Sequence, residues 1–110
     1  MRAITRIIFL DDNDEKFFGE GPCRLLHAIE ATGSLNAAAQ SMGMAYTKAL
    51  KLINNAEKAL GFKLTVRVVG GKSGGGSKLT DEGKAWLERY EAYREACYRE
   101  NGRLYDEYFK

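Results

Sequence analysis

Apolar and polar positions change period several times along the chain, and each change marks the boundary of an expected element. β-Branched and aromatic residues dominate 3–10, which predicts a strand, and a second short strand over 16–18 would complete a hairpin. The Asp-rich stretch at 11–14 is a typical turn, because short acidic side chains hydrogen-bond their own backbone. Helical spacing over 21–33 predicts a first helix, and the residues on its apolar face are Leu25, Leu26 and Ile29.

Two further helices follow, separated by a glycine. Ser34 is a good N-cap for a short helix over 35–42, and Gly43 interrupts it. A longer helix is expected from about 45 to 60, where Gly61 ends it. The apolar face of this longer helix consists of Ala49, Leu52, Ile53, Ala56 and Leu60.

The last third of the chain predicts a second hairpin and a long helix. A strand over 64–69 leads into a loop over 70–77 that contains five glycines, and the chain returns as a short strand over 78–80. Thr80 caps a helix over 81–108, which we expect to be weakened at Asn101-Gly102. Helix, turn, helix and glycine-tipped hairpin together predict a mainly α fold with a small β component: a winged helix-turn-helix with an N-terminal β-hairpin and a long C-terminal helix.

Small residues at the turn support this prediction. With Gly43 in the turn, Ala39 lies where the two helices cross closely, so a longer side chain would push them apart. The positions expected to pack inside the motif are Ala38, Met42, Met44, Ala49 and Leu52. Helix pairs of similar spacing that bind nothing remain the alternative interpretation.

Charge is distributed unevenly along the chain. Residues 21–80 hold eight Lys and Arg against two Glu, whereas both flanking segments are mildly acidic. A basic block of this kind favours a polyanionic partner such as duplex DNA, although a solvated basic face is the simpler alternative. Two cysteines indicate a reducing, cytoplasmic compartment, and no apolar stretch is long enough to predict a membrane span.

The motifs of the helix pair and the wing resemble a known family. Quoted as they stand, they are Thr32-Gly33-Ser34, Ala37-Ala38-Ala39, Met42-Gly43-Met44-Ala45-Tyr46, Ala49, Gly70-Gly71-Lys72, Gly74-Gly75-Gly76, Leu79-Thr80 and Gly83. They are similar to the DNA-binding domain of ModE, the molybdate-responsive transcription regulators related to LysR-type winged helix-turn-helix proteins. The likeness covers roughly 5–95, including Phe18-Gly19-Glu20-Gly21.

The resemblance implies DNA binding only. Full-length members carry C-terminal oxyanion-binding domains, whereas we expect a standalone domain here, without a cofactor, a small-molecule site or molybdate sensing. Family members often carry serine at the position of Ala45 and an aromatic residue at that of Leu50, and Thr47-Lys48 also departs from the commoner arrangement. The DNA sequence that the family reads is therefore not carried over.

In this fold the start of the second motif helix enters the major groove, and the wing lies along the minor groove or backbone. Tyr46 could contact a phosphate through its hydroxyl or could equally be a half-buried aromatic residue of the core. Ser34 could lie at a phosphate or could equally serve only as a helix cap. The residues expected at the DNA interface are Ser34, Ala45, Tyr46, Thr47, Lys48, Lys51, Arg67, Lys72, Ser73 and Lys78.

The last helix carries an aromatic stripe at coiled-coil spacing, which predicts a homodimer. Its residues are Trp86, Tyr90, Tyr93, Cys97, Leu104 and Tyr108, of which Trp86 and Tyr90 can also reach the core of their own chain. We therefore expect 1–80 to form the DNA-binding part and 81–110 the dimerisation helix of one domain. An intramolecular fold-back at Asn101-Gly102 is the alternative.

Other functions find less support. A nucleotide-binding loop at Gly71-Lys72-Ser73 would need a glycine at position 66, where Val66 stands. His27 has no accompanying nucleophile with which to act as a catalytic base, so we expect no enzyme. Cys23 and His27 have metal-ligand spacing, but Cys97 is the only further Cys or His, so we expect no metal site. A winged-helix interaction domain that dimerises without reading DNA remains the second hypothesis.

Overall fold

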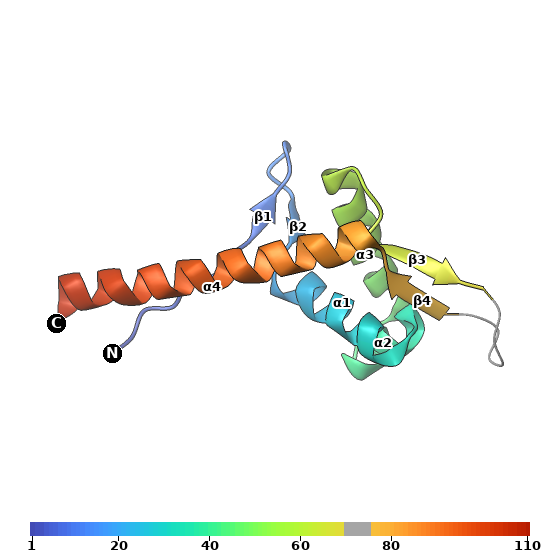
Figure 1. Cartoon of the computed structure of the whole chain (residues 1–110), viewed down its shortest axis with the longest axis horizontal. Helices are drawn as coiled ribbons and strands as arrows, with labels where there is room; N and C mark the ends of the chain where they lie inside the picture. The colour runs from blue at the N-terminus through green and yellow to red at the C-terminus, as the bar shows by residue number, and fades with distance from the viewer. Residues whose placement is uncertain (70–75) are drawn as a thin grey trace.

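The computed structural model describes residues 1–69 and 76–110, and it has the predicted order of elements (Figure 1). A small antiparallel hairpin is followed by three helices, a second antiparallel hairpin and a long helix. The elements are β1 (Phe9–Leu10), β2 (Lys16–Phe18), α1 (Glu20–Thr32), α2 (Leu35–Ser41), α3 (Tyr46–Leu60), β3 (Thr65–Val68), β4 (Gly76–Leu79) and α4 (Asp81–Phe109). The fold is a winged helix-turn-helix, as the sequence predicts.

The core forms where α1, α2 and α3 meet, and the predicted apolar faces supply it. Leu25, Leu26 and Ile29 of α1 are fully buried. Ala38 and Ala39 of α2 are buried as well, so the backbones of α2 and α3 approach closely. The α3 residues that face this core are Ala49, Leu52, Ile53, Ala56 and Leu60.

The turn between α2 and α3 confirms the role expected for glycine. Gly43 has φ +64°, in the left-handed region that side chains disfavour, and its N–H donates to the Gln40 carbonyl at 3.0 Å. The Met44 N–H donates to the Ala39 carbonyl at 2.9 Å, and Met42 and Met44 pack against the core. The turn therefore fixes the direction in which α3 leaves α2.

The β3–β4 hairpin is docked on the end of α1. The Ser77 N–H donates to the Gly33 carbonyl at 2.8 Å, and a Cβ on Gly76 would lie 2.2 Å from the same oxygen. Only glycine fits at that point of closest approach. Gly76 and Ser77 therefore belong to β4, not to the glycine-rich loop that the sequence predicts over 70–77.

The predicted N-terminal strand is mostly wrong. Only Phe9–Leu10 of the expected range 3–10 pairs with β2, because β2 has three residues and offers no partner to the rest. The preceding segment instead runs beside the C-terminal half of α4 (Figure 1). The Tyr105 hydroxyl donates to the Met1 carbonyl at 2.8 Å, and the Asn101 amide donates to the Ala3 carbonyl at 2.9 Å.

Helix α4 is continuous through Asn101-Gly102, so both the expected weakening and the fold-back alternative are wrong. The Arg103 guanidinium lies 3.0 Å from Glu100 and 3.3 Å from Glu107, at the i,i+3 and i,i+4 spacings that support a helix. The hydrogen bond from Asn101 to the N-terminal segment also stabilises this part of α4. The helix accounts for the elongated shape of the molecule, 58 × 28 × 25 Å.

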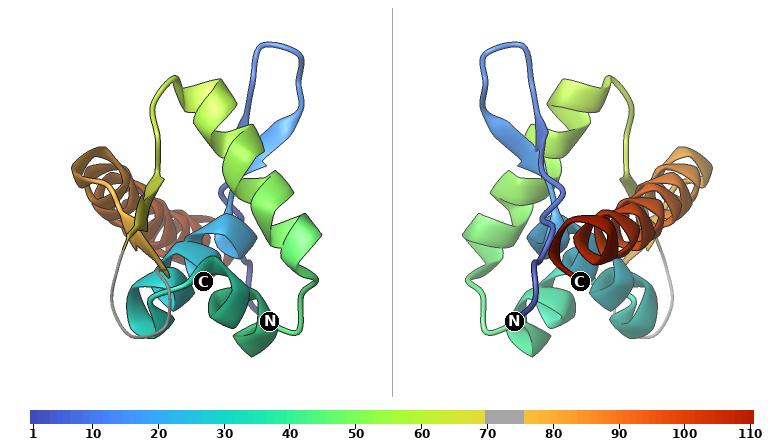
Figure 2. Two further views of the ribbon diagram at one scale, coloured as in Figure 1. Left: turned by 90° about the vertical axis from the view of Figure 1, so that its right-hand side faces the viewer. Right: turned by 90° about the vertical axis from the view of Figure 1, so that its left-hand side faces the viewer.

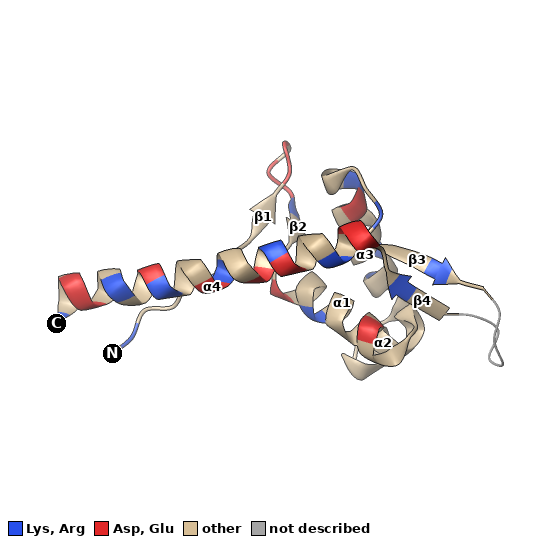
Figure 3. Cartoon of the chain, in the orientation of Figure 1, with Lys and Arg blue, Asp and Glu red and all other residues tan. Residues whose placement is uncertain are grey.

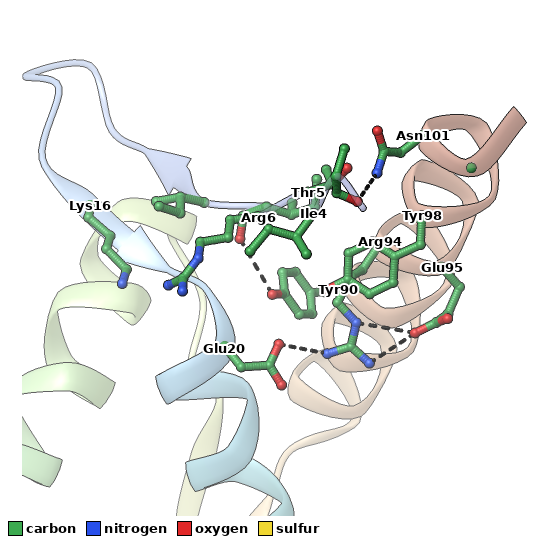
Figure 4. A pocket seen from close by; sticks show the side chains of 14 residues that line it. Ile4, Thr5, Arg6, Lys16, Glu20, Tyr90, Arg94, Glu95, Tyr98 and Asn101 are labelled. Carbon is green, nitrogen blue, oxygen red and sulfur yellow. Dashed lines mark hydrogen bonds and ion pairs between the residues drawn. The ribbon is translucent and has the colours of Figure 1, made fainter. Parts of the chain in front are cut away.

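The N-terminal segment and α4, with Lys16 and Glu20, line an open cavity of about 780 Å³ (Figure 4). The Tyr90 hydroxyl points across it towards the Ile7 carbonyl at 3.5 Å, and Arg94 pairs with Glu20 at 3.0 Å. Because the cavity is lined by residues far apart in the sequence, no local pattern indicated it. Within residues 1–69 and 76–110, no helix combines the length and apolar character that a membrane span requires.

Glu57 joins α3 to β3 through its carboxylate. Its Oε2 accepts hydrogen bonds from the Leu64 N–H at 2.8 Å and the Thr65 N–H at 3.3 Å, and the side chain is 10% exposed. We expect Glu57→Ala to lower the free energy of unfolding by about 2 kcal/mol, because both donors lose a charged acceptor.

Urea denaturation measures this effect, and Lys63→Ala is the control. Lys63 Nζ lies 3.6 Å from the same carboxylate but is 78% exposed, so its removal should cost less than about 0.5 kcal/mol. Equal losses in the two variants would contradict a backbone-capping role for Glu57.

Candidate nucleic-acid interface

One face of α3 is polar and open to solvent. Thr47, Lys48 and Lys51 are all exposed, whereas Ala49 between them is fully buried. Tyr46, in the first turn, is 47% exposed and does not belong to the core. The helical period thus separates a core face from a basic face on the same helix.

The start of α3 is suited to an anion. Ala45 is the N-cap residue and has no side-chain oxygen with which to satisfy the first N–H groups. The first turn also contains no acidic residue, so the positive end of the helix dipole is not neutralised within it. Backbone donors and Lys48 are therefore available together at one helix end.

Ser34 has a capping role in this structure. Its Oγ accepts a hydrogen bond from the Ala37 N–H at 2.9 Å, which satisfies one donor of the first turn of α2. The side chain of Thr32 also donates to the Ser34 carbonyl at 3.1 Å. The cap and the half-buried position account for Ser34 without a ligand.

The register of β3 and β4 places the two basic side chains of the described part of this hairpin, the wing, on different faces. Val66 pairs with Lys78 and Arg67 pairs with Ser77. Since cross-strand partners share a face, Arg67 and Lys78 project from opposite faces of the hairpin. Lys72 and Ser73 lie outside the described residues.

Basic residues outnumber acidic ones at the end of the molecule that carries α3 and the β3–β4 hairpin. Figure 2 shows α3 on one side of α1 and α2 and the β3–β4 hairpin on the other. Figure 3 shows Lys and Arg on these elements, acidic residues at the β1–β2 turn, and both signs interspersed along α4. An anionic ligand would therefore be attracted to the end that carries α3 and the wing.

Sequence analysis missed two residues of the polar face of α3. Asn54 and Lys58 are exposed and follow Thr47 and Lys51 at intervals of seven residues, so they extend the same face. The helical period alone could have found them, because a spacing of seven residues is nearly two turns.

The aromatic stripe of α4 divides into two parts. Tyr90 is 2% exposed, and Trp86 is half-buried among aromatic rings, with centroids 5.3 Å from Phe9 and 5.4 Å from Phe18. These two side chains hold α4 to the hairpin, so they do not form part of an exposed seam. The remaining members vary in exposure: Tyr93 54%, Leu104 42%, Tyr108 72%, and Cys97 half-buried.

Comparison with known proteins agrees with the fold. The family model of bacterial regulatory helix-turn-helix proteins, lysR family, matches residues 23–84. The chain is 40% identical over 85 residues to the molybdenum transport protein ModE of Azotobacter vinelandii. The aligned region covers 74% of this chain and 32% of that protein.

Two further relatives extend the comparison. The molybdenum transport protein ModE of Herbaspirillum seropedicae is 42% identical over 67 residues, and the transcriptional regulator ModE of Yersinia pestis is 36% identical over 67 residues. Each match covers 61% of this chain but only 23% and 26% of the respective relative. The chain thus spans between about a quarter and a third of the length of the relatives it matches, and by the family match over 23–84 it belongs to the lysR family of bacterial regulatory helix-turn-helix proteins.

Proposed function

We propose that this chain is a DNA-binding transcription regulator that acts in the cytoplasm as a homodimer. The observation that carries the proposal is the start of α3, where exposed Lys48 and Lys51 accompany helix N–H groups that no acidic residue neutralises. The family to which the chain belongs supports it, because these are regulatory helix-turn-helix proteins.

In the proposed complex, the first turns of α3 enter the major groove. Thr47, Lys48 and Lys51 reach base edges or phosphates, while Tyr46 offers its hydroxyl to a phosphate oxygen. The wing residues Arg67 and Lys78 contact the backbone on either side of the hairpin, and the start of α2 at Ser34 lies near a phosphate. The residues 1–80 supply this DNA-binding part of the proposed arrangement.

The dimer uses residues 81–110. Beyond Tyr93, helix α4 extends past the core and carries exposed Leu104 and Tyr108 on one side. Pairing of these residues with a second copy would bury them and present two α3 helices to successive major grooves, about 34 Å apart.

Salt dependence tests the binding itself. We expect the intact chain to bind a pool of labelled genomic duplexes at low salt, and the affinity to fall steeply towards physiological salt. Each phosphate contact contributes about −0.9 to the slope of log K against log salt. The absence of binding even at low salt would contradict the regulator function and favour an interaction domain that does not read DNA.

Substitution locates the binding surface. We expect Lys48→Ala and Lys51→Ala each to reduce affinity, and each to make the salt slope shallower by about 0.9 if the lysine contacts a phosphate. Lys110→Ala removes the same charge at the far end of α4 and should change neither quantity. Equal effects of all three substitutions would mean that net charge, not α3, determines binding.

A further inference from the structure

Three potential metal ligands converge where α1 meets α4. Cys23 and His27 stand one turn apart on α1, and Glu91 reaches them from α4. His27 Nε2 lies 3.0 Å from Glu91 Oε1, and the Cys23 Sγ, a ring nitrogen of His27 and a Glu91 oxygen all lie within 4.8 Å of one another. The cluster has no part in the proposed DNA interface.

We propose that Cys23, His27 and Glu91 bind a divalent transition-metal ion of the zinc type, with the fourth position open to water. Thiolate, imidazole and carboxylate are the three ligand types that zinc accepts. In a tetrahedral site with bonds of about 2.0 to 2.3 Å, neighbouring donor atoms are roughly 3.3 to 3.6 Å apart. The three donors lie within 4.8 Å of one another, so each pair would have to close by no more than about 1.5 Å to reach that spacing.

A fourth residue supports the assignment from outside the cluster. Glu30 Oε1 lies 3.8 Å from Nδ1 of His27, on the side of the ring opposite Glu91. Metal-binding histidines usually donate their other ring N–H to a carboxylate, which fixes the tautomer and leaves the remaining nitrogen free for the metal. At 3.8 Å the Glu30 carboxylate is beyond hydrogen-bond distance, so it would have to move closer to Nδ1 to perform this function while Nε2 faces Glu91.

Charge and solvent access are compatible with a dication. A Cys23 thiolate and the Glu91 carboxylate would balance its two charges. Arg94 contacts both of these ligands, with Nη2 3.6 Å from Glu91 Oε2 and Nη1 3.9 Å from Cys23 Sγ, and its own charge is offset by Glu20 at 3.0 Å and Glu95 at 3.3 Å. Cys23 is 2% exposed, but the side chains of His27 and Glu91 are 50% and 33% exposed, so an ion can enter from their side. Burial and then the Glu91 carboxylate raise the pKa of the Cys23 thiol, so the ion must displace a proton on binding.

The sequence-based expectation of no metal site counted only Cys and His as donors. The third ligand is a carboxylate 64 residues from His27, and carboxylates on α4 are too numerous for one to be chosen from sequence alone. A bound ion would link α1, which leads into the helix-turn-helix, to α4. Metal binding at this position does not require DNA binding.

Cobalt(II) is the probe, because a cobalt–thiolate bond gives a charge-transfer absorption in the near ultraviolet that carboxylate or histidine binding does not. We expect the reduced, intact chain to show this band and saturate at one equivalent, and Zn²⁺ to displace the cobalt. Cys97→Ser removes the other thiol and should leave the band unchanged. No band in the wild-type chain, or loss of the band in Cys97→Ser, would overturn the proposal.

Exposed ligands allow a test that does not disturb the core. We expect His27→Gln to weaken cobalt binding by about 100-fold or more, and Glu30→Gln to weaken it by about tenfold, because Glu30 orients the His27 ring without touching the ion. Circular dichroism verifies that both variants fold. Unchanged affinity in folded His27→Gln would show that the His27–Glu91 contact is only a hydrogen bond between two helices.

Discussion

Gly83→Ala is expected to destabilise the protein by at least about 3 kcal/mol, although alanine is the better helix former. Gly83 lies in the first turn of α4, where the helix rests directly on the backbone of Leu64. A Cβ at this position would lie 2.3 Å from the Leu64 carbonyl oxygen and 3.1 Å from its Cα. Neither atom can move aside as the end of a flexible side chain could.

The contact is rigid because other bonds fix both sides of it. The Thr80 N–H donates to the same Leu64 carbonyl at 2.9 Å, and the Thr80 hydroxyl caps the helix by accepting from the Gly83 N–H at 2.8 Å. Leu64 itself is fully buried. To accept a methyl group, α4 would have to tilt away and give up the cap or the packing of Leu87.

Gly102→Ala is the matched control, since it makes the same change in the same helix. Apart from its chain neighbours and the nearby backbone of its own helix, no atom of residues 1–69 and 76–110 lies within 4 Å of the position that its Cβ would take. We therefore expect it to stabilise the protein by about 0.5 to 1 kcal/mol through helix propensity alone. Chemical denaturation of the two variants should give opposite signs, and a neutral Gly83→Ala would contradict the close contact.

Local signals made most of the helix-turn-helix predictable. The cap at Ser34, the left-handed Gly43 and the small Ala39 all act within a few residues of each other. The prediction of a strand over 3–10 was wrong because a strand depends on a partner elsewhere in the chain. That partner must match its length, and β2 is too short. Gly83 was noticed only as part of a family motif, because its partner Leu64 is distant in sequence.

The candidate DNA interface was predictable to the same extent. Lys48 and Lys51 follow from the helical period, which puts them opposite the buried Ala49. Predicting that Arg67 and Lys78 lie on opposite faces of the wing would have required the register of β3 and β4, which the sequence does not give. The division of the α4 stripe likewise required knowing how far along the helix the core extends.

Leu104→Glu is expected to convert the proposed dimer into a monomer and to reduce affinity for a two-half-site duplex by about 100-fold. A charge placed in an apolar helix seam must be desolvated against the partner helix, which disfavours association. Monomers then bind each half-site independently and lose the advantage of linked binding. Leu104 is 42% exposed, so the substitution should leave the folded chain intact.

Ala92→Glu adds the same negative charge at an exposed position of the same helix. It lies twelve residues from Leu104, about a third of a turn around the helix, and therefore off the stripe. Light scattering should report a dimer for the wild-type chain and for Ala92→Glu, and a monomer for Leu104→Glu. A monomeric wild-type chain, or a Leu104→Glu variant that stays fully dimeric, would refute the proposed seam and assign dimerisation to another surface or to none.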